Sequence, residues 1–95
     1  MYKVIIIDDN KNDLNMMKNK IINCNKLELE CFQDVSKIDM NKNYDAVFID
    51  IDMPMMNGID FANQYKLKHL DTFIIFVTNH SELVFDTFKV HPLIL

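Results

Sequence analysis

Short aliphatic runs alternate with amphipathic stretches along the whole chain, and this alternation limits the possible folds more than any other feature. The apolar runs cover residues 3–7, 27–31, 45–49, 73–77 and 93–95. The stretches with apolar residues at helical spacing cover 12–23, 58–68 and 81–88, and a shorter candidate helix covers 34–40. Such alternation is typical of βα units around a parallel sheet. We therefore expect one α/β domain.

The apolar runs differ in how they are expected to be covered. Residues 3–7 are almost continuously aliphatic, which suits a strand buried on both faces. In residues 27–31 the apolar positions alternate with Glu28 and Glu30. This period of two indicates a more exposed strand, near or at the edge of the sheet. Asn10 or Asn12 can cap the helix that follows the first strand.

Composition excludes several classes of protein. Of the 95 residues, 49% are hydrophobic, which is too many for a disordered chain, while no apolar run is long enough to span a bilayer. Residue Met1 starts a strand-like segment rather than a secretory signal, so we expect a cytoplasmic protein. Cys24 and Cys31 form no CxxC pair and are expected to stay reduced. The net charge of −4, with no arginine, makes nucleic acid a poor partner for this segment.

Polar groups that can do chemistry follow three of the expected strands. Asp8 and Asp9 follow the first strand, Asp50 follows the third and Thr78 follows the fourth. Ligands of open parallel sheets bind beyond the carboxyl ends of the strands. In a flavodoxin-like, doubly wound sheet of order 2-1-3-4-5, the first and third strands are neighbours. We therefore expect these residues to share one pocket.

Three carboxylates in one pocket repel one another and favour a bound cation. Mg²⁺ fits best, because it prefers oxygen ligands and often links carboxylates to a phosphate. A carboxylate beside this ion can act as a nucleophile toward a phosphoryl group, and Asp50 is the best-placed candidate. The Thr78 hydroxyl can then donate to a phosphoryl oxygen.

Three segments carry a resemblance to a known family. They are VIIIDD at residues 4–9, AVFIDIDMPMMNG at 46–58 with its D-x-x-M-P-x-x-x-G pattern, and VT at 77–78. The chain resembles the receiver domain of bacterial two-component response regulators, which has a CheY-like fold. The stretch VFDTFKVHPL at 84–93 is similar to receivers fused to LytTR-type DNA-binding domains.

The resemblance implies a role for each acidic position. Asp50 looks like the phosphoacceptor that receives a phosphoryl group from a sensor histidine kinase. Asp9 looks like a direct Mg²⁺ ligand, and Asp8 like a neighbour that acts largely through metal-bound water. Asp52 is expected to offer its backbone carbonyl to the metal, and Thr78 looks like the switch hydroxyl. Such a domain is not a conventional enzyme, although it catalyses its own phosphotransfer and dephosphorylation.

The resemblance also predicts parts that these 95 residues do not contain. The family's lysine at the end of the fifth strand should fall just beyond Leu95, and its aromatic switch position aligns with Leu95 itself. We therefore expect residues 1–95 to be a receiver domain truncated within its fifth strand, without the last helix or an output domain. An open sheet edge would then invite pairing with a second copy of the chain.

Other interpretations of the same residues remain open at this point. An isolated pair such as Asp8 and Asp9 more often caps a helix than binds a metal. The D-x-D sequence from Asp50 to Asp52 also resembles the nucleophile motif of haloacid-dehalogenase-type phosphatases. A pseudo-receiver that acts only as an interaction module would keep all the acids. The histidines share no ligand spacing, and each, including His69, is expected at the surface.

Overall fold

The computed structural model describes residues 1–23, 26–50 and 58–77, which form four strands and two α-helices. The strands are β1 (Tyr2–Ile7), β2 (Leu27–Phe32), β3 (Ala46–Asp50) and β4 (Phe73–Val77). The helices are α1 (Lys11–Ile21), α2 (Gly58–Lys68) and the short 3₁₀ helix η1 (Val35–Lys37). The helix expected over 81–88 and the strand expected over 93–95 lie outside the described residues.

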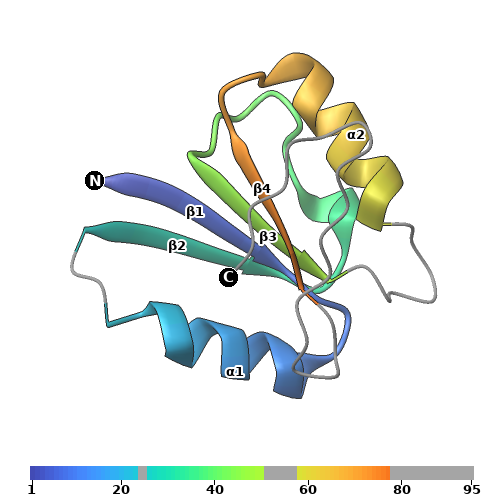
Figure 1. Cartoon of the computed structure of the whole chain (residues 1–95). Helices are drawn as coiled ribbons and strands as arrows, with labels where there is room; N and C mark the ends of the chain where they lie inside the picture. The colour runs from blue at the N-terminus through green and yellow to red at the C-terminus, as the bar shows by residue number, and fades with distance from the viewer. Residues whose placement is uncertain (24–25, 51–57, 78–95) are drawn as a thin grey trace.

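The four strands form one parallel sheet in the order β2-β1-β3-β4 (Figure 1). Strand β1 pairs with β2 on one side and β3 on the other, so that Ile7 stands opposite both Phe32 and Ile49. This arrangement confirms the predicted order for the four described strands. It also confirms that β2 forms an edge of the described sheet.

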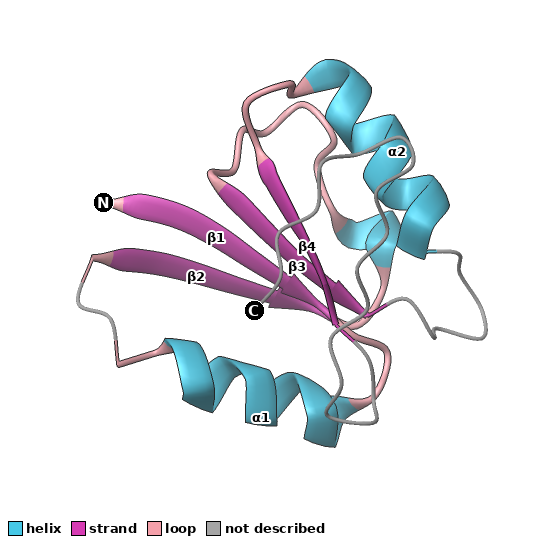
Figure 2. Ribbon diagram, viewed as in Figure 1, coloured by secondary structure: helices cyan, strands magenta, loops and turns pink. Residues whose placement is uncertain are grey.

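The two α-helices cover opposite faces of the sheet (Figure 2). Val4 and Ile6 of β1 pack toward α1 in a cluster that contains Leu14, while Ile5 and Ile7 belong to the cluster on the α2 side. Successive residues of a strand point to opposite faces, so a continuous aliphatic run supplies both cores. The doubly wound architecture is therefore confirmed.

Among the described residues, no helix is both long and apolar enough to cross a membrane.

Helix α1 begins at the first of the two predicted caps. The Asn10 side chain accepts a hydrogen bond from the Asp13 backbone N–H at 3.1 Å, which satisfies one of the free donors of the first turn. The helix thus starts at Lys11, one residue before the expected boundary. Lys18 and Lys20 in its last turn suit the negative end of the helix dipole.

The segment that joins β2 to β3 contains only the three-residue helix η1, so the expectation of a helix over 34–40 was wrong for most of its length. The Asp34 carboxylate accepts a hydrogen bond from the Ser36 backbone N–H at 2.9 Å. The Asp39 carboxylate binds the Asn41 backbone N–H in the same way, also at 2.9 Å. Aspartate side chains that bind the backbone two residues onward stabilise turns at the expense of a helix.

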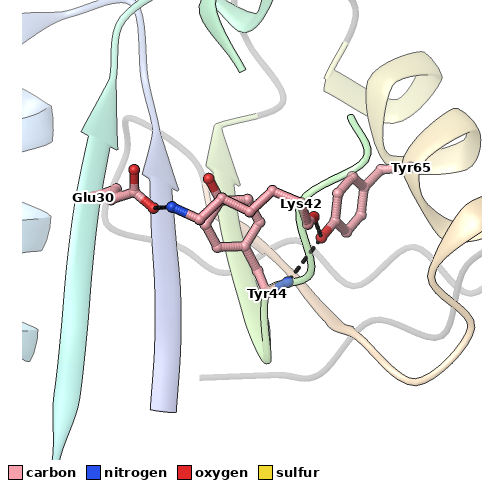
Figure 3. Close-up of polar contacts among 4 residues, drawn as sticks. All are labelled: Glu30, Lys42, Tyr44 and Tyr65. Atoms are coloured by element: carbon pink, nitrogen blue, oxygen red, sulfur yellow. Dashed lines mark hydrogen bonds and ion pairs between the residues drawn. The ribbon is translucent and has the colours of Figure 1, made fainter. Parts of the chain in front are cut away.

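Tyr65 of α2 connects this irregular segment to the rest of the core (Figure 3). Its hydroxyl accepts a hydrogen bond from the Tyr44 backbone N–H at 2.9 Å and donates one to the Lys42 carbonyl at 2.8 Å. The Lys42 ammonium forms an ion pair with Glu30 of β2 at 2.7 Å. A fully buried tyrosine therefore holds the backbone that leads into β3.

His69 is half-buried rather than free at the surface, which corrects the expectation for this residue. Its ring stacks on Tyr65 with the ring centroids 4.2 Å apart. Its Nε2 lies 2.7 Å from the Met40 carbonyl oxygen, and its Nδ1 contacts the Asn43 side chain. These contacts attach the end of α2 to the same irregular segment. His80 and His91 lie outside the described residues.

Candidate functional site at the carboxyl ends of β1 and β3

Three carboxylates meet where β1 and β3 end. Asp8 and Asp9 directly follow β1, and Asp50 is the last residue of β3. The register that pairs Ile7 with Ile49 places Asp8 and Asp50 next to each other. One oxygen from each of Asp8, Asp9 and Asp50 lies within 4.8 Å of the others. The structure thus brings together the acidic side chains that were predicted to share a pocket.

The three carboxylates differ in their exposure to solvent. Asp8 and Asp50 are almost fully buried, with exposed fractions of 2% and 1%, whereas Asp9 is partly exposed. Burial raises the pKa of Asp8 to about 7, and the nearby Asp50 carboxylate also raises it. A hydrogen bond from the Asn10 backbone N–H to Asp8, at 2.9 Å, opposes this rise. The site therefore favours either a shared proton or a cation between Asp8 and Asp50.

Gly58, the first residue of α2, allows this helix to begin against the end of β3. A Cβ atom at position 58 would lie 2.7 Å from the Asp50 backbone carbonyl oxygen and 3.3 Å from the Ile49 side chain. In the sequence, Gly58 indicates a loop and belongs to the family motif, but this pattern predicts no contact with Asp50. Gly58 is the only glycine in the sequence, and this was the one sign that the backbone comes close to another segment there.

Gln33 is a second residue beside the acidic cluster whose position the sequence pattern did not predict. It follows β2, and its side-chain amide donates a hydrogen bond to the Asp9 backbone carbonyl at 3.3 Å. The available signal was its position, because it is the polar residue that directly follows the second strand. Asp52 and Thr78, the other two predicted site residues, lie outside the described residues.

The chemistry of the cluster suits a hard cation. All three side chains offer carboxylate oxygens, the ligands that Mg²⁺ prefers, and the described residues contribute no histidine or cysteine to the group. The buried pair Asp8 and Asp50 gains most from such an ion, because their charges are otherwise weakly screened.

A parallel sheet with helices on both faces and an acidic cluster at the carboxyl ends of its central strands is typical of doubly wound α/β domains that bind ligands at this edge. Comparison with known families identifies the family. Residues 4–90 match the response regulator receiver domain. The chain belongs to this family, which confirms the resemblance seen in the sequence. Family membership also removes the support for a haloacid-dehalogenase-type phosphatase.

Curated relatives agree with this assignment. The chain is 33% identical over 92 residues to the sensory transduction protein LytR of Staphylococcus saprophyticus, covering 93% of this chain and 34% of that protein. It is 31% identical over 101 residues to the transcriptional regulatory protein NatR of Bacillus subtilis, covering 100% of this chain and 43% of that protein. The chain therefore spans about a third of the length of the LytR relative.

Solved structures share the fold. The BeF₃-activated DrrB receiver domain has a TM-score of 0.73 at 22% identity, over 92% of this chain and 70% of that one. The response regulator TrrA of Thermotoga maritima, in complex with Mg²⁺-BeF, has a TM-score of 0.71 at 27% identity, over 84% of this chain and 73% of that one. These similarities confirm the receiver fold.

Proposed function

We propose that this receiver domain accepts a phosphoryl group on Asp50. The observation that carries the proposal is the cluster of three carboxylate oxygens within 4.8 Å, built by the ends of two adjacent strands. Asp50 is the member of the cluster on β3, and its side chain is almost fully buried. A fixed carboxylate beside other oxygen ligands is suited to phosphoryl transfer, in which positioning and charge stabilisation supply most of the catalysis.

Mg²⁺ is the proposed cofactor, and the residues present fit it. Asp8, Asp9 and Asp50 would hold the ion, together with the backbone carbonyl of Asp52. The bound ion would neutralise the charge that builds up on the phosphoryl oxygens. Similarity to TrrA supports this choice, because that structure is a complex with Mg²⁺-BeF.

The reaction at Asp50 is an exchange of one bond to phosphorus for another. A carboxylate oxygen of Asp50 attacks the phosphorus of a phosphohistidine on a sensor kinase. The new O–P bond forms as the N–P bond breaks, and the histidine nitrogen keeps the electron pair and takes up a proton.

The proposed readout depends on residues and partners beyond the acidic cluster. Thr78 is proposed to donate its hydroxyl to a phosphoryl oxygen and so to sense the modification.

The sensor histidine kinase is the proposed phosphoryl donor, and a second receiver copy is a further candidate partner. DNA would be contacted only by an output domain. Similarity to LytR supports the LytTR-type subfamily. Cytoplasmic location also remains a prediction.

Acetyl phosphate with Mg²⁺ tests the proposal directly. We expect the chain to gain one phosphoryl group, detected by intact-protein mass spectrometry. Asp50→Asn should abolish this gain, because an amide is a far weaker nucleophile than a carboxylate. Asp71→Asn is the matched control, since Asp71 is an exposed aspartate and should label like the wild type.

Two outcomes would count against the proposal. Persistent labelling of Asp50→Asn would assign the phosphoacceptor to another residue. A wild-type chain that gains no phosphoryl group would favour the alternative in which the domain is a pseudo-receiver and acts only as an interaction module.

A further inference from the structure

The end of β2 lies directly beside the turn that carries the acidic pair. The Asp8 backbone N–H donates a hydrogen bond to the Phe32 carbonyl at 3.1 Å, which continues the pairing of β1 with β2 past Ile7. Gln33 is therefore the first residue after β2, and it lies next to Asp9. The turn formed by Asp34 with Ser36 then fixes the chain on the other side of Gln33.

The peptide group between Asp9 and Asn10 is held from both sides. Its N–H, on Asn10, donates to the Asp8 carboxylate at 2.9 Å, and its carbonyl, on Asp9, accepts from the Gln33 amide at 3.3 Å. A peptide group is planar, so two hydrogen bonds at opposite edges fix its orientation. This orientation limits the directions that the Asp9 side chain can take.

We propose that Gln33 is a positioning residue that orients the Asp9 peptide and so presents the Asp9 carboxylate to the divalent cation. This inference rests on the proposed function, because it assigns Gln33 a role in binding the same Mg²⁺. Asp9 needs such support more than its neighbours do. Asp8 and Asp50 are fixed by burial, whereas Asp9 is partly exposed and follows the end of its strand.

Gln33→Met tests the role of the amide donor. Methionine keeps the length of the side chain but cannot donate to the Asp9 carbonyl. We expect the Kd for Mg²⁺, measured by NMR titration, to rise about two- to fivefold, as suits the loss of one solvent-exposed hydrogen bond. Gln64→Met on α2 is the matched control, because Gln64 is also an exposed glutamine, and its Kd should equal that of the wild type.

Gln33→Glu separates positioning from charge. A carboxylate in place of the amide also loses the donor, but it adds a negative charge near the cation. Its Kd should therefore lie between those of the wild type and Gln33→Met. A Kd for Gln33→Met equal to that of Gln64→Met would overturn the inference.

Amide hydrogen exchange in metal-free protein tests the same role without relying on the metal. The Asn10 N–H should exchange about two- to fivefold faster in Gln33→Met than in the wild type or Gln64→Met, since the peptide group has lost one of its two restraints. Unchanged exchange at Asn10 would overturn the inference. If the wild type bound no Mg²⁺, the proposed function would fail at that step, and the exchange rates would still decide whether Gln33 orders the turn.

Discussion

The backbone of Gly58 packs so closely against the Asp50 carbonyl that an added Cβ would lie 2.7 Å from that oxygen. The contacted atom belongs to the backbone, so it cannot move aside as a flexible side chain would. The first residue of α2 therefore touches the residue that we propose to be phosphorylated. The lack of a side chain at position 58 allows the helix to approach the strand this closely.

Gly58→Ala should consequently destabilise the domain and disturb Asp50 together. We expect the free energy of unfolding to fall by about 1–3 kcal/mol, the usual cost of forcing an extra methyl group into a packed contact. Urea unfolding gives this value, and acetyl phosphate labelling gives the effect on Asp50. Gln64→Ala, at an exposed position of the same helix, should change stability by less than about 0.5 kcal/mol. Equal stability of the two variants would contradict the close approach.

Asp8→Asn should stabilise the metal-free domain, and the gain should grow with pH. Burial and Asp50 raise the pKa of Asp8 from 3.8 to about 7, so the protonated form favours the folded state. The stability that this proton supplies is complete below pH 4 and is lost as the pH rises through 7. At pH 8 in a chelator, we expect Asp8→Asn to be more stable than the wild type by about 1–3 kcal/mol.

Thermal unfolding at several pH values checks this sign. The difference in Tm between Asp8→Asn and the wild type should be larger at pH 8 than at pH 5. Asp71→Asn provides the control for removing an exposed aspartate. A difference that stays constant over this range would show that the carboxylate does not titrate as described.

Mg²⁺ should raise the thermal stability of the wild type by binding the folded state alone. An ion present at about 100 times its Kd adds roughly 2.7 kcal/mol to the free energy of unfolding. Asp9→Asn should lose most of this gain, because it removes one of the three clustered carboxylates. Asp71→Asn should keep the full gain. Equal stabilisation of Asp9→Asn and the wild type would remove Asp9 from the set of ligands.

Tyr65→Phe should destabilise the domain through the backbone that precedes β3. The change removes the hydroxyl that accepts a hydrogen bond from the Tyr44 N–H and donates one to the Lys42 carbonyl. The buried Tyr44 N–H then loses the acceptor that Tyr65 provides. We expect a loss of about 1–3 kcal/mol in urea unfolding. Tyr2→Phe is the matched control, because Tyr2 is 59% exposed and should unfold like the wild type. A loss of the same size in both variants would contradict this role of Tyr65.

The periodicity of the sequence was enough to predict the layers of the fold and the meeting of the three carboxylates. Continuous aliphatic residues such as Ile5 and Ile6 require cover on both faces of a sheet, and helical spacing of apolar residues supplies that cover. Asp8, Asp9 and Asp50 were predicted to meet because the carboxyl ends of parallel strands lie at the same edge. These inferences depend only on local periodicity and on the rules for connecting strands.

The groups around the acidic cluster, and the path of the chain between β2 and β3, could not be predicted in this way because they depend on contacts between distant segments. The hydrogen bond of Gln33 to Asp9 joins residues 24 positions apart, and that of Tyr65 to Tyr44 joins residues 21 positions apart. The unequal burial of Asp8 and Asp9 likewise depends on the elements packed around them. Local periodicity carries no information about such contacts, because each one forms only when distant segments pack together.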